Sequence, residues 1–408
     1  MTRYLALPKN DAVIAALGMT DVSMNPEARK SQVERVKAMR RAFGAQTRGP
    51  DPVTAAVAHD ATIVGDPEET TSVTGVMVFD LDDKAQVDAI RDELTEYEVI
   101  EDLPLSLIPP MRSGQPEGAA ATLDTWHLEA VLVKAARAAG YKGRGAGVGV
   151  AILDTGVEEV DEIKGKIKSA FRLNKTTTKA EAIATMDTEG HGTHVAGLIA
   201  GDTVGIAPEA ELMNFIMIPG AMGNVSDFIF AIDFVANRPE ISIINMSAGI
   251  PGFHGSMKPS VVLARNMGIL PVIAIGNEGA NKTRSPGNYT DVLSVGASSR
   301  DSKVASFSGG GTMVPESMSY TVPDLVAPGK EITSCVMGGG FEAWNGTSMA
   351  TPIVSGVAAL IIERFPNITL PDLTDEIIGA LKPLGGVPEI RQGGGLLQFP
   401  RHIWHMGS

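Results

Sequence analysis

Two long apolar runs constrain the fold of this chain more than any other feature. Apart from Gly149 and Pro271, the segments 148–153 and 269–275 contain only Val, Ile, Leu and Ala. Runs without alternating polar positions are typical of strands covered on both faces, as in a parallel sheet between two layers of helices. Helix and strand patterns alternate around them, so we predict a doubly wound, mostly parallel α/β domain with flanking helices.

The expected elements of this domain, which we place at residues 124–404, follow one another along the chain. We expect helices at Trp126–Ala139, after His191, at Val225–Ala236 and from about Thr351 to Arg364, and strands at Val148–Leu153, Glu211–Ile218, Ile241–Met246, Ile269–Ile275 and Val292–Val295. In an open parallel sheet, function lies at the carboxyl ends of the strands. Polar residues that directly follow a strand are therefore the first candidates for chemistry.

Residues 1 to about 115 have a different pattern. We expect a strand at Tyr4–Leu7, a helix at Glu27–Phe43, strands at Val53–Val64 and Val73–Leu81, a helix at Lys84–Leu94 and a strand at Glu98–Leu103. This βαββαβ order predicts a small α+β domain with a sheet of its own. The proline-rich stretch 103–116 ends it, and the residues to about 123 read as a linker.

Composition excludes several classes of partner. The chain has 48 acidic and 34 basic residues and a net charge of −14, which argues against nucleic acid or an anionic membrane as the main partner. Residues 1–50 hold nine basic and four acidic side chains, whereas 51–102 hold fifteen acidic and two basic ones, so we expect the basic stretch to be solvated or paired internally. No apolar run reaches the ~18 residues of a membrane helix. The first residues lack a hydrophobic signal core, and both a cytoplasmic location and secretion after removal of a signal stay open.

Three polar residues stand in unusual surroundings. Asp154 directly follows an apolar strand, His191 begins the segment His-Gly-Thr-His, and Ser348 lies in Gly-Thr-Ser-Met-Ala-Thr-Pro. Each has a plain reading, because an isolated serine before a helix is often a cap and one histidine of a close pair is often packed. A zinc site would need a third ligand, and the glycines at 143–149 precede a strand instead of following one, which argues against a dinucleotide loop.

Taken together, the three segments resemble the signature motifs of subtilisin-like serine proteases. Asp-Thr-Gly at 154–156, His-Gly-Thr-His-Val-Ala-Gly at 191–197 and Gly-Thr-Ser-Met-Ala-Thr-Pro at 346–352 stand in the family's Asp, His, Ser order. Ile-Gly-Asn277-Glu-Gly resembles the segment with the family's oxyanion asparagine. The resemblance implies a serine endopeptidase that acts on peptides or unfolded proteins through an acyl-enzyme and requires no cofactor.

The resemblance also implies a role for each residue. Ser348 would be the nucleophile, His191 the base that takes its proton, Asp154 the group that orients the imidazole, and Asn277 an oxyanion donor. The following segments would bind substrate as added β-strands or line the primary pocket: Ser247, Ala248 and Gly249; Ala274, Ile275 and Gly276; and Ile218 and Gly220. Arg284 near the base of that pocket would favour small or acidic side chains if it pointed inward, but a long charged side chain is expected to point to solvent.

By the same resemblance, residues 1–115 are expected to be an inhibitory propeptide and folding aid. Its tail, Leu103-Pro-Leu-Ser-Leu-Ile-Pro-Pro110, would lie in the protease cleft. Because proline disfavours the Ile108–Pro109 junction, processing is expected between about Met111 and Asp124, or is deferred. An unrelated accessory domain is the alternative.

Two further expectations concern metal and activity. Many subtilisins carry a calcium loop after the catalytic helix, but Gly201 to Pro208 closes that gap almost at once, so we predict no metal there, while calcium elsewhere stays open. A catalytically silent binding module that keeps the fold is the alternative to an enzyme, and acyl transfer on a non-peptide substrate is the alternative to a protease.

Overall fold

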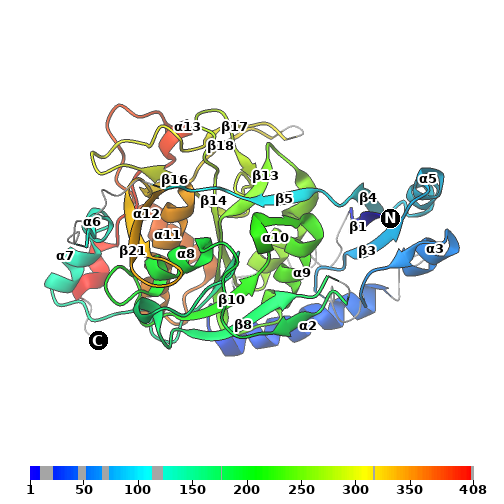
Figure 1. Ribbon diagram of the computed structural model, residues 1–408, viewed down its shortest axis with the longest axis horizontal. Coiled ribbons are helices and arrows are strands. Elements are labelled where there is room, and N and C mark those ends of the chain that lie inside the picture. Colours follow the sequence, from blue (N-terminus) through cyan, green and yellow to red (C-terminus); the bar gives the residue numbers. More distant parts are fainter. Residues whose placement is uncertain are drawn as a thin grey trace.

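The computed structural model describes residues 1–9, 22–44, 52–66, 73–112, 123–175, 177–315 and 318–405. An eight-stranded sheet in the order β19-β16-β14-β12-β7-β10-β8-β9 forms the centre of the larger body (Figure 1). Its strands are β7 (Gly149–Asp154), β8 (Ile167–Leu173), β9 (Ala180–Ala182), β10 (Glu211–Ile216), β12 (Ile241–Met246), β14 (Leu270–Ala274), β16 (Leu293–Ser298) and β19 (Leu325–Pro328). All neighbouring pairs are parallel except β8 and β9, which confirms the doubly wound, mostly parallel sheet.

Strand β7 shows why its sequence has no polar positions. Val150 and Ile152 face a core that contains helices α8 (His191–Ala200) and α11 (Thr347–Arg364). Ala151 and Leu153 face the opposite core, formed with α9 (Val225–Ala236) and α10 (Lys258–Asn266). Because successive side chains of a strand alternate between faces, both sets must be apolar.

Two helix predictions need correction. The segment 126–139 forms two short helices, α6 (Trp126–Ala130) and α7 (Val133–Ala138), which are separated at Leu132, a residue with φ of 64°. Helix α11 begins at Thr347 and not near Thr351, so Pro352 lies inside the helix and Ser348 is on its first turn.

The first 101 residues contain a separate sheet in the order β2-β3-β1-β4. Its strands are β1 (Thr2–Pro8), β2 (Thr62–Ile63), β3 (Met77–Leu81) and β4 (Tyr97–Glu101), and the helices are α2 (Pro26–Gly44), α3 (Pro52–Ala58) and α5 (Lys84–Glu93). The predicted strand Val53–Val64 is wrong over its first half, which forms helix α3, and only Thr62–Ile63 near its end is a strand. Pro52 suits the first turn of a helix, and Ala55 and Ala56 favour the helical state and pack into the small core of this unit.

The smaller unit reaches the larger body through two extensions. Helix α2 runs along the larger body, and β5 (Pro104–Leu107) crosses it on another side (Figure 1). The remaining strands and helices are β6 (Met111–Arg112), β11 (Met222–Asn224), β13 (Ala248–Pro251), β15 (Arg284–Ser285), β17 (Gly311–Met313), β18 (Tyr320–Val322), β20 (Ile332–Cys335), β21 (Phe341–Asn345), α12 (Leu370–Gly379) and α13 (Glu389–Gln392). Among the described residues, no helix has the length and apolar character needed to cross a bilayer.

Candidate active site

Asp154 and His191 meet at the carboxyl end of the central strand. Asp154 is the last residue of β7 and His191 the first residue of α8, and His191 Nδ1 lies 2.8 Å from Asp154 Oδ1. Both side chains are buried. A Cβ atom on Gly192 would lie 1.9 Å from the carbonyl oxygen of Gly156, so glycine is required for α8 to approach the strand this closely.

Ser348 and Asn277 lie at the ends of two other elements. Ser348 is on the first turn of α11, and Asn277 follows β14. The oxygen Oδ1 of Asn277 accepts the Thr347 backbone N–H at 2.8 Å and the Thr347 hydroxyl at 2.9 Å. A backbone N–H can only donate, so the Asn277 side-chain atom that faces Thr347 must be the oxygen. The amide nitrogen of Asn277 therefore points away from Thr347 and donates to the carbonyl of Pro109 at 3.1 Å.

A segment of the chain itself occupies the cleft beside these residues. Strand β5 lies between β11 and β13, with Leu107 opposite Ala248 and Ser106 opposite Gly249. The Ile108 N–H donates to the carbonyl of Ser247 at 3.0 Å. The edge Ser247–Gly249 therefore binds an extended segment as an added strand.

The second neighbour of this segment differs from the prediction. Met222–Asn224 pairs with β5, and Ile218–Gly220 does not. Pro219 has no N–H to donate, and Gly220 has φ of 62°, so this stretch forms a turn and not a strand edge. Nothing in the sequence marked Met222–Asn224 as a strand, apart from its place directly before a well-capped helix.

Arg284 does not point to solvent as expected. Its side chain is buried, and its Nε donates to Glu278 Oε1 at 2.7 Å. Nη1 donates to the carbonyl of Gly249 at 3.1 Å and to the Ser106 hydroxyl at 3.0 Å. The Glu278 carboxylate offsets the cost of burying the guanidinium. Nothing in the sequence pattern had indicated Glu278 as a partner of Arg284. The predicted pocket residues directly before Asn277 are Ala274, Ile275 and Gly276. The carbonyl of Ile275 accepts the backbone N–H of Arg284 at 2.9 Å.

Ser348 is engaged by the segment in the cleft. Its hydroxyl donates to the carbonyl of Ile108 at 3.1 Å, while His191 Nε2 has no hydrogen-bond partner among the described residues. Beyond the two prolines, Met111 and Arg112 form β6, which pairs with Asn345 and Trp344 of β21. The Arg112 guanidinium lies over the Trp344 ring at 5.0 Å from its centroid. The described chain thus crosses the cleft on both sides of Ser348.

A comparison with protein families identifies the fold and its chemistry. Residues 145–394, more than half of the chain, match the model of the subtilase family, Peptidase_S8. The chain belongs to the subtilase family. It is a subtilisin-like serine protease, and as such a hydrolase that acts on peptides or proteins.

Curated relatives of this subtilase are bacterial proteases. The chain is 36% identical over 276 residues to an intracellular serine protease of Paenibacillus polymyxa, covering 62% of this chain and 79% of the relative. It is 32% identical over 267 residues to subtilisin Savinase of Lederbergia lenta, covering 64% and 92%. It is 30% identical over 350 residues to a thermostable alkaline protease of Halalkalibacterium halodurans, covering 83% and 90%.

His194 is the packed member of the histidine pair in this subtilase. Its ring stacks on Trp344 with 4.3 Å between the centroids, and Nε2 lies 3.2 Å from the carbonyl of Glu342. Burial lowers the pKa of His194 to about 3, so the ring is neutral at physiological pH. Trp344, which no sequence motif had indicated, therefore contacts His194 on α8 and Arg112 of β6.

Subtilases need no cofactor for catalysis, and the turn after α8 in this chain is held by protein groups. Glu162 Oε1 accepts the backbone N–H of Thr203 at 2.6 Å and that of Val204 at 3.0 Å, and the Thr203 hydroxyl also contacts this carboxylate. Within the described ranges, no group of three or more His, Cys, Asp or Glu side chains is arranged to hold a metal ion.

Proposed function

We propose that this subtilase is a serine endopeptidase made as a self-inhibited zymogen. Asp154, His191 and Ser348 form the triad, and Asn277 is an oxyanion donor. Residues 124–404 form the catalytic domain, and residues 1–115 form an inhibitory propeptide. The observation that carries the proposal is the position of the segment 104–112 in the cleft. Its Ile108 carbonyl accepts a hydrogen bond from Ser348, and its Pro109 carbonyl accepts one from Asn277.

The chemistry follows from the residue types. Ser348 Oγ attacks the substrate carbonyl carbon as His191 Nε2 takes its proton, and the Asp154 carboxylate at Nδ1 stabilises the imidazolium. The tetrahedral oxyanion accepts hydrogen bonds from the Asn277 amide and from the Ser348 backbone N–H. When the C–N bond breaks, His191 gives its proton to the leaving amine, and water then hydrolyses the acyl-enzyme by the same path.

The segment in the cleft contacts Ser348 and Asn277 in a register that differs from the one a substrate needs. Ser348 bonds the carbonyl of Ile108, whereas Asn277 bonds the carbonyl of the next residue, Pro109. A productive substrate presents the same carbonyl to the nucleophile and to the oxyanion donor, so the two groups are out of register here. Processing is then expected between Met111 and Asp124, most of which lies outside the described residues.

Extended substrates fit this cleft best. Ala248–Gly249 and Met222–Asn224 supply main-chain hydrogen bonds on both sides of β5 and make few demands on side chains. We expect substrates to be unfolded or looped segments. The turn 201–208 is expected to bind no calcium, because its Glu162 carboxylate is already used by N–H and O–H donors.

Covalent labelling tests the proposal. A fluorophosphonate probe should label the whole chain slowly and the processed enzyme rapidly, and it should not label the Ser348→Ala variant. Intact mass and N-terminal sequencing of wild type beside Ser348→Ala should place a new N-terminus between residues 111 and 124 in wild type alone. Absence of labelling at Ser348 in every form would instead favour a silent binding module.

A further inference from the structure

Arg29 is a fully buried cation on helix α2, remote from the cleft residues 104–112. Its Nη1 donates to the carbonyl of Pro239 at 2.8 Å, Nε to that of Met267 at 3.2 Å, and Nη2 to that of Arg238 at 3.3 Å. Within the described part of the chain, all of its hydrogen bonds go to backbone carbonyls. Burial lowers the pKa of Arg29 to about 9, and the guanidinium stays charged at physiological pH.

These carbonyls belong to the ends of two helices of the catalytic domain. Helix α9 ends at Ala236 and α10 at Asn266, so Met267 directly follows α10, whereas Arg238 and Pro239 lie two and three residues beyond the end of α9. The carboxyl end of a helix carries the negative end of its dipole, and a cation beside it is stabilised. Gln32, one turn further along α2, donates to the carbonyl of Asn266 at 3.0 Å. Helix α2 thus caps both helices.

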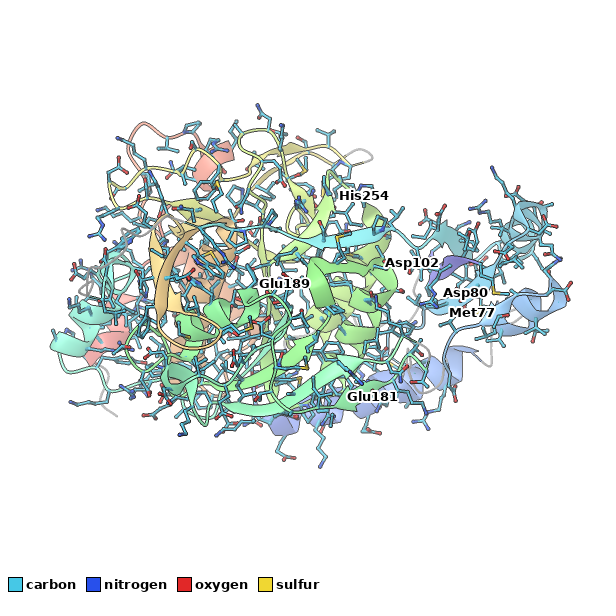
Figure 2. All side chains as sticks on the ribbon, in the orientation of Figure 1. Met77, Asp80, Asp102, Glu181, Glu189 and His254 are labelled. Atoms are coloured by element: carbon cyan, nitrogen blue, oxygen red, sulfur yellow. The ribbon has the colours of Figure 1, made fainter. Side chains whose placement is uncertain are left out.

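The opposite end of α9 is bound by an acid from the same N-terminal unit. Asp102 Oδ1 accepts the backbone N–H of Ser226 at 2.9 Å, and Oδ2 accepts the Ser226 hydroxyl at 2.6 Å. Figure 2 labels Asp102 where the smaller unit meets the larger body. The N-terminal unit therefore holds α9 at both ends, with an anion at its N-terminus and a cation at its C-terminus. Asp102 also accepts the side-chain amide of Asn224, at the strand edge that binds β5, whereas the carbonyls bound by Arg29 are not part of the cleft.

We propose that the ends of α9 and α10 are a second docking site, which Arg29 occupies and which keeps the N-terminal unit bound after the chain is cut between residues 113 and 122. The inference rests on the proposed function, in which such a cut occurs. With α2 docked, a segment 104–112 displaced by substrate returns to the cleft as an intramolecular event at high effective concentration. The cut enzyme is then inhibited until α2 itself is undocked or degraded.

Release of the cut unit tests this. In a full chain with Ser348→Ala, residues 113–122 are replaced by the recognition sequence of a site-specific protease. After cutting, the catalytic part is immobilised and loss of the N-terminal fragment is timed. Arg29→Met should speed release at least tenfold, whereas Arg35→Met, an exposed arginine on the same helix, should change it less than twofold. Equal release rates for the two variants would overturn the proposal.

Two further measurements keep the result decisive. If the uncut Arg29→Met chain does not fold, Gln32→Ala replaces it, and release at least threefold faster is required for the proposal to stand. The same cut chain with Ser348 intact separates the two proposals. Activity while the fragment remains bound would refute inhibition by segment 104–112 but leave the docking site standing, whereas equal release from Arg29→Met and wild type would refute the docking site alone.

Discussion

The Asp233 carboxylate, on the last turn of helix α9, accepts the backbone N–H of Thr74 at 2.7 Å and so joins the N-terminal unit to the catalytic domain. It also accepts the Val73 N–H at 2.9 Å. Burial raises the pKa of Asp233 to about 6 from 3.8, and burial also raises the pKa of Asp102 in the same interface. Both acids are therefore harder to ionise when the two parts are in contact.

This predicts pH-dependent release. A carboxyl whose pKa is raised in the bound state favours that state fully below pH 3.8, and this contribution is lost as the pH rises through about 6. Release of the cut N-terminal unit should be faster at pH 7 than at pH 4.5, because the contact favours the protonated carboxyl. Asp233→Asn should flatten this dependence, and Asp92→Asn, at an exposed position, should not. A wild-type release rate that is independent of pH would contradict the prediction.

Replacement of the triad should abolish most peptide hydrolysis without unfolding the protein. Ser348→Ala, His191→Ala and the double variant should retain about the same small rate, because the two residues act as a unit. Asn277→Leu should lower kcat by roughly 10²–10³, a magnitude taken from the corresponding donor in subtilisin. The check is kcat and KM on a peptide substrate with circular dichroism for folding, and near-wild-type hydrolysis by Ser348→Ala would disprove the assignment.

Removal of the prolines should convert the inhibitory segment into a substrate. Pro109→Ala with Pro110→Ala restores two backbone N–H groups and lets Ser348 and Asn277 engage one carbonyl. New cleavage near residue 108 should appear in the intact mass within the time that wild type remains uncut there. Pro104→Ala, at the exposed start of β5, is the matched control and should add no cut. An uncut double variant would show that another feature protects the segment.

Arg284 should select the substrate side chain that occupies the position of Ser106. Its Nη1 reaches the Ser106 hydroxyl, so small or acidic side chains there should raise kcat/KM several-fold over lysine. Arg284→Met should remove the preference for acidic side chains while leaving kcat on a serine-containing peptide within a few-fold. A peptide library that shows no discrimination at this position in wild type would refute the role.

The turn at 201–208 should be independent of metal and dependent on Glu162. A chelator should therefore change the Tm of wild type and of Glu162→Gln by the same amount. Glu162→Gln should destabilise the fold by about 1 kcal/mol, because the backbone N–H groups of exposed Thr203 and buried Val204 lose a charged acceptor. Thermal unfolding of both proteins with and without chelator checks this, and a chelator effect that Glu162→Gln removes would reveal a cation at this carboxylate.

Local sequence was sufficient wherever one segment carried the whole signal. The apolar runs around Val150 and Val272 required strands buried on both faces, and Asp154 and His191 stand at the element ends where they were predicted. Ser348 lies on the first turn of a helix that begins four residues earlier than predicted. Segments with weaker patterns failed. Val53–Val64 read as a strand, but the fit of Ala55 and Ala56 into a small core favoured a helix.

The relations between distant segments were decided by the tertiary structure. Arg284 is buried because Glu278 and the carbonyl of Gly249 surround it. Strand β5 pairs with Met222–Asn224 and not with Ile218–Gly220 because Pro219 and Gly220 form a turn. Arg29 read as one more charge on a solvated helix until folding brought the ends of α9 and α10 against it. Patterns of propensity and polarity act within a segment, whereas the cost of burying a charge depends on which carbonyls and carboxylates the rest of the chain places around it.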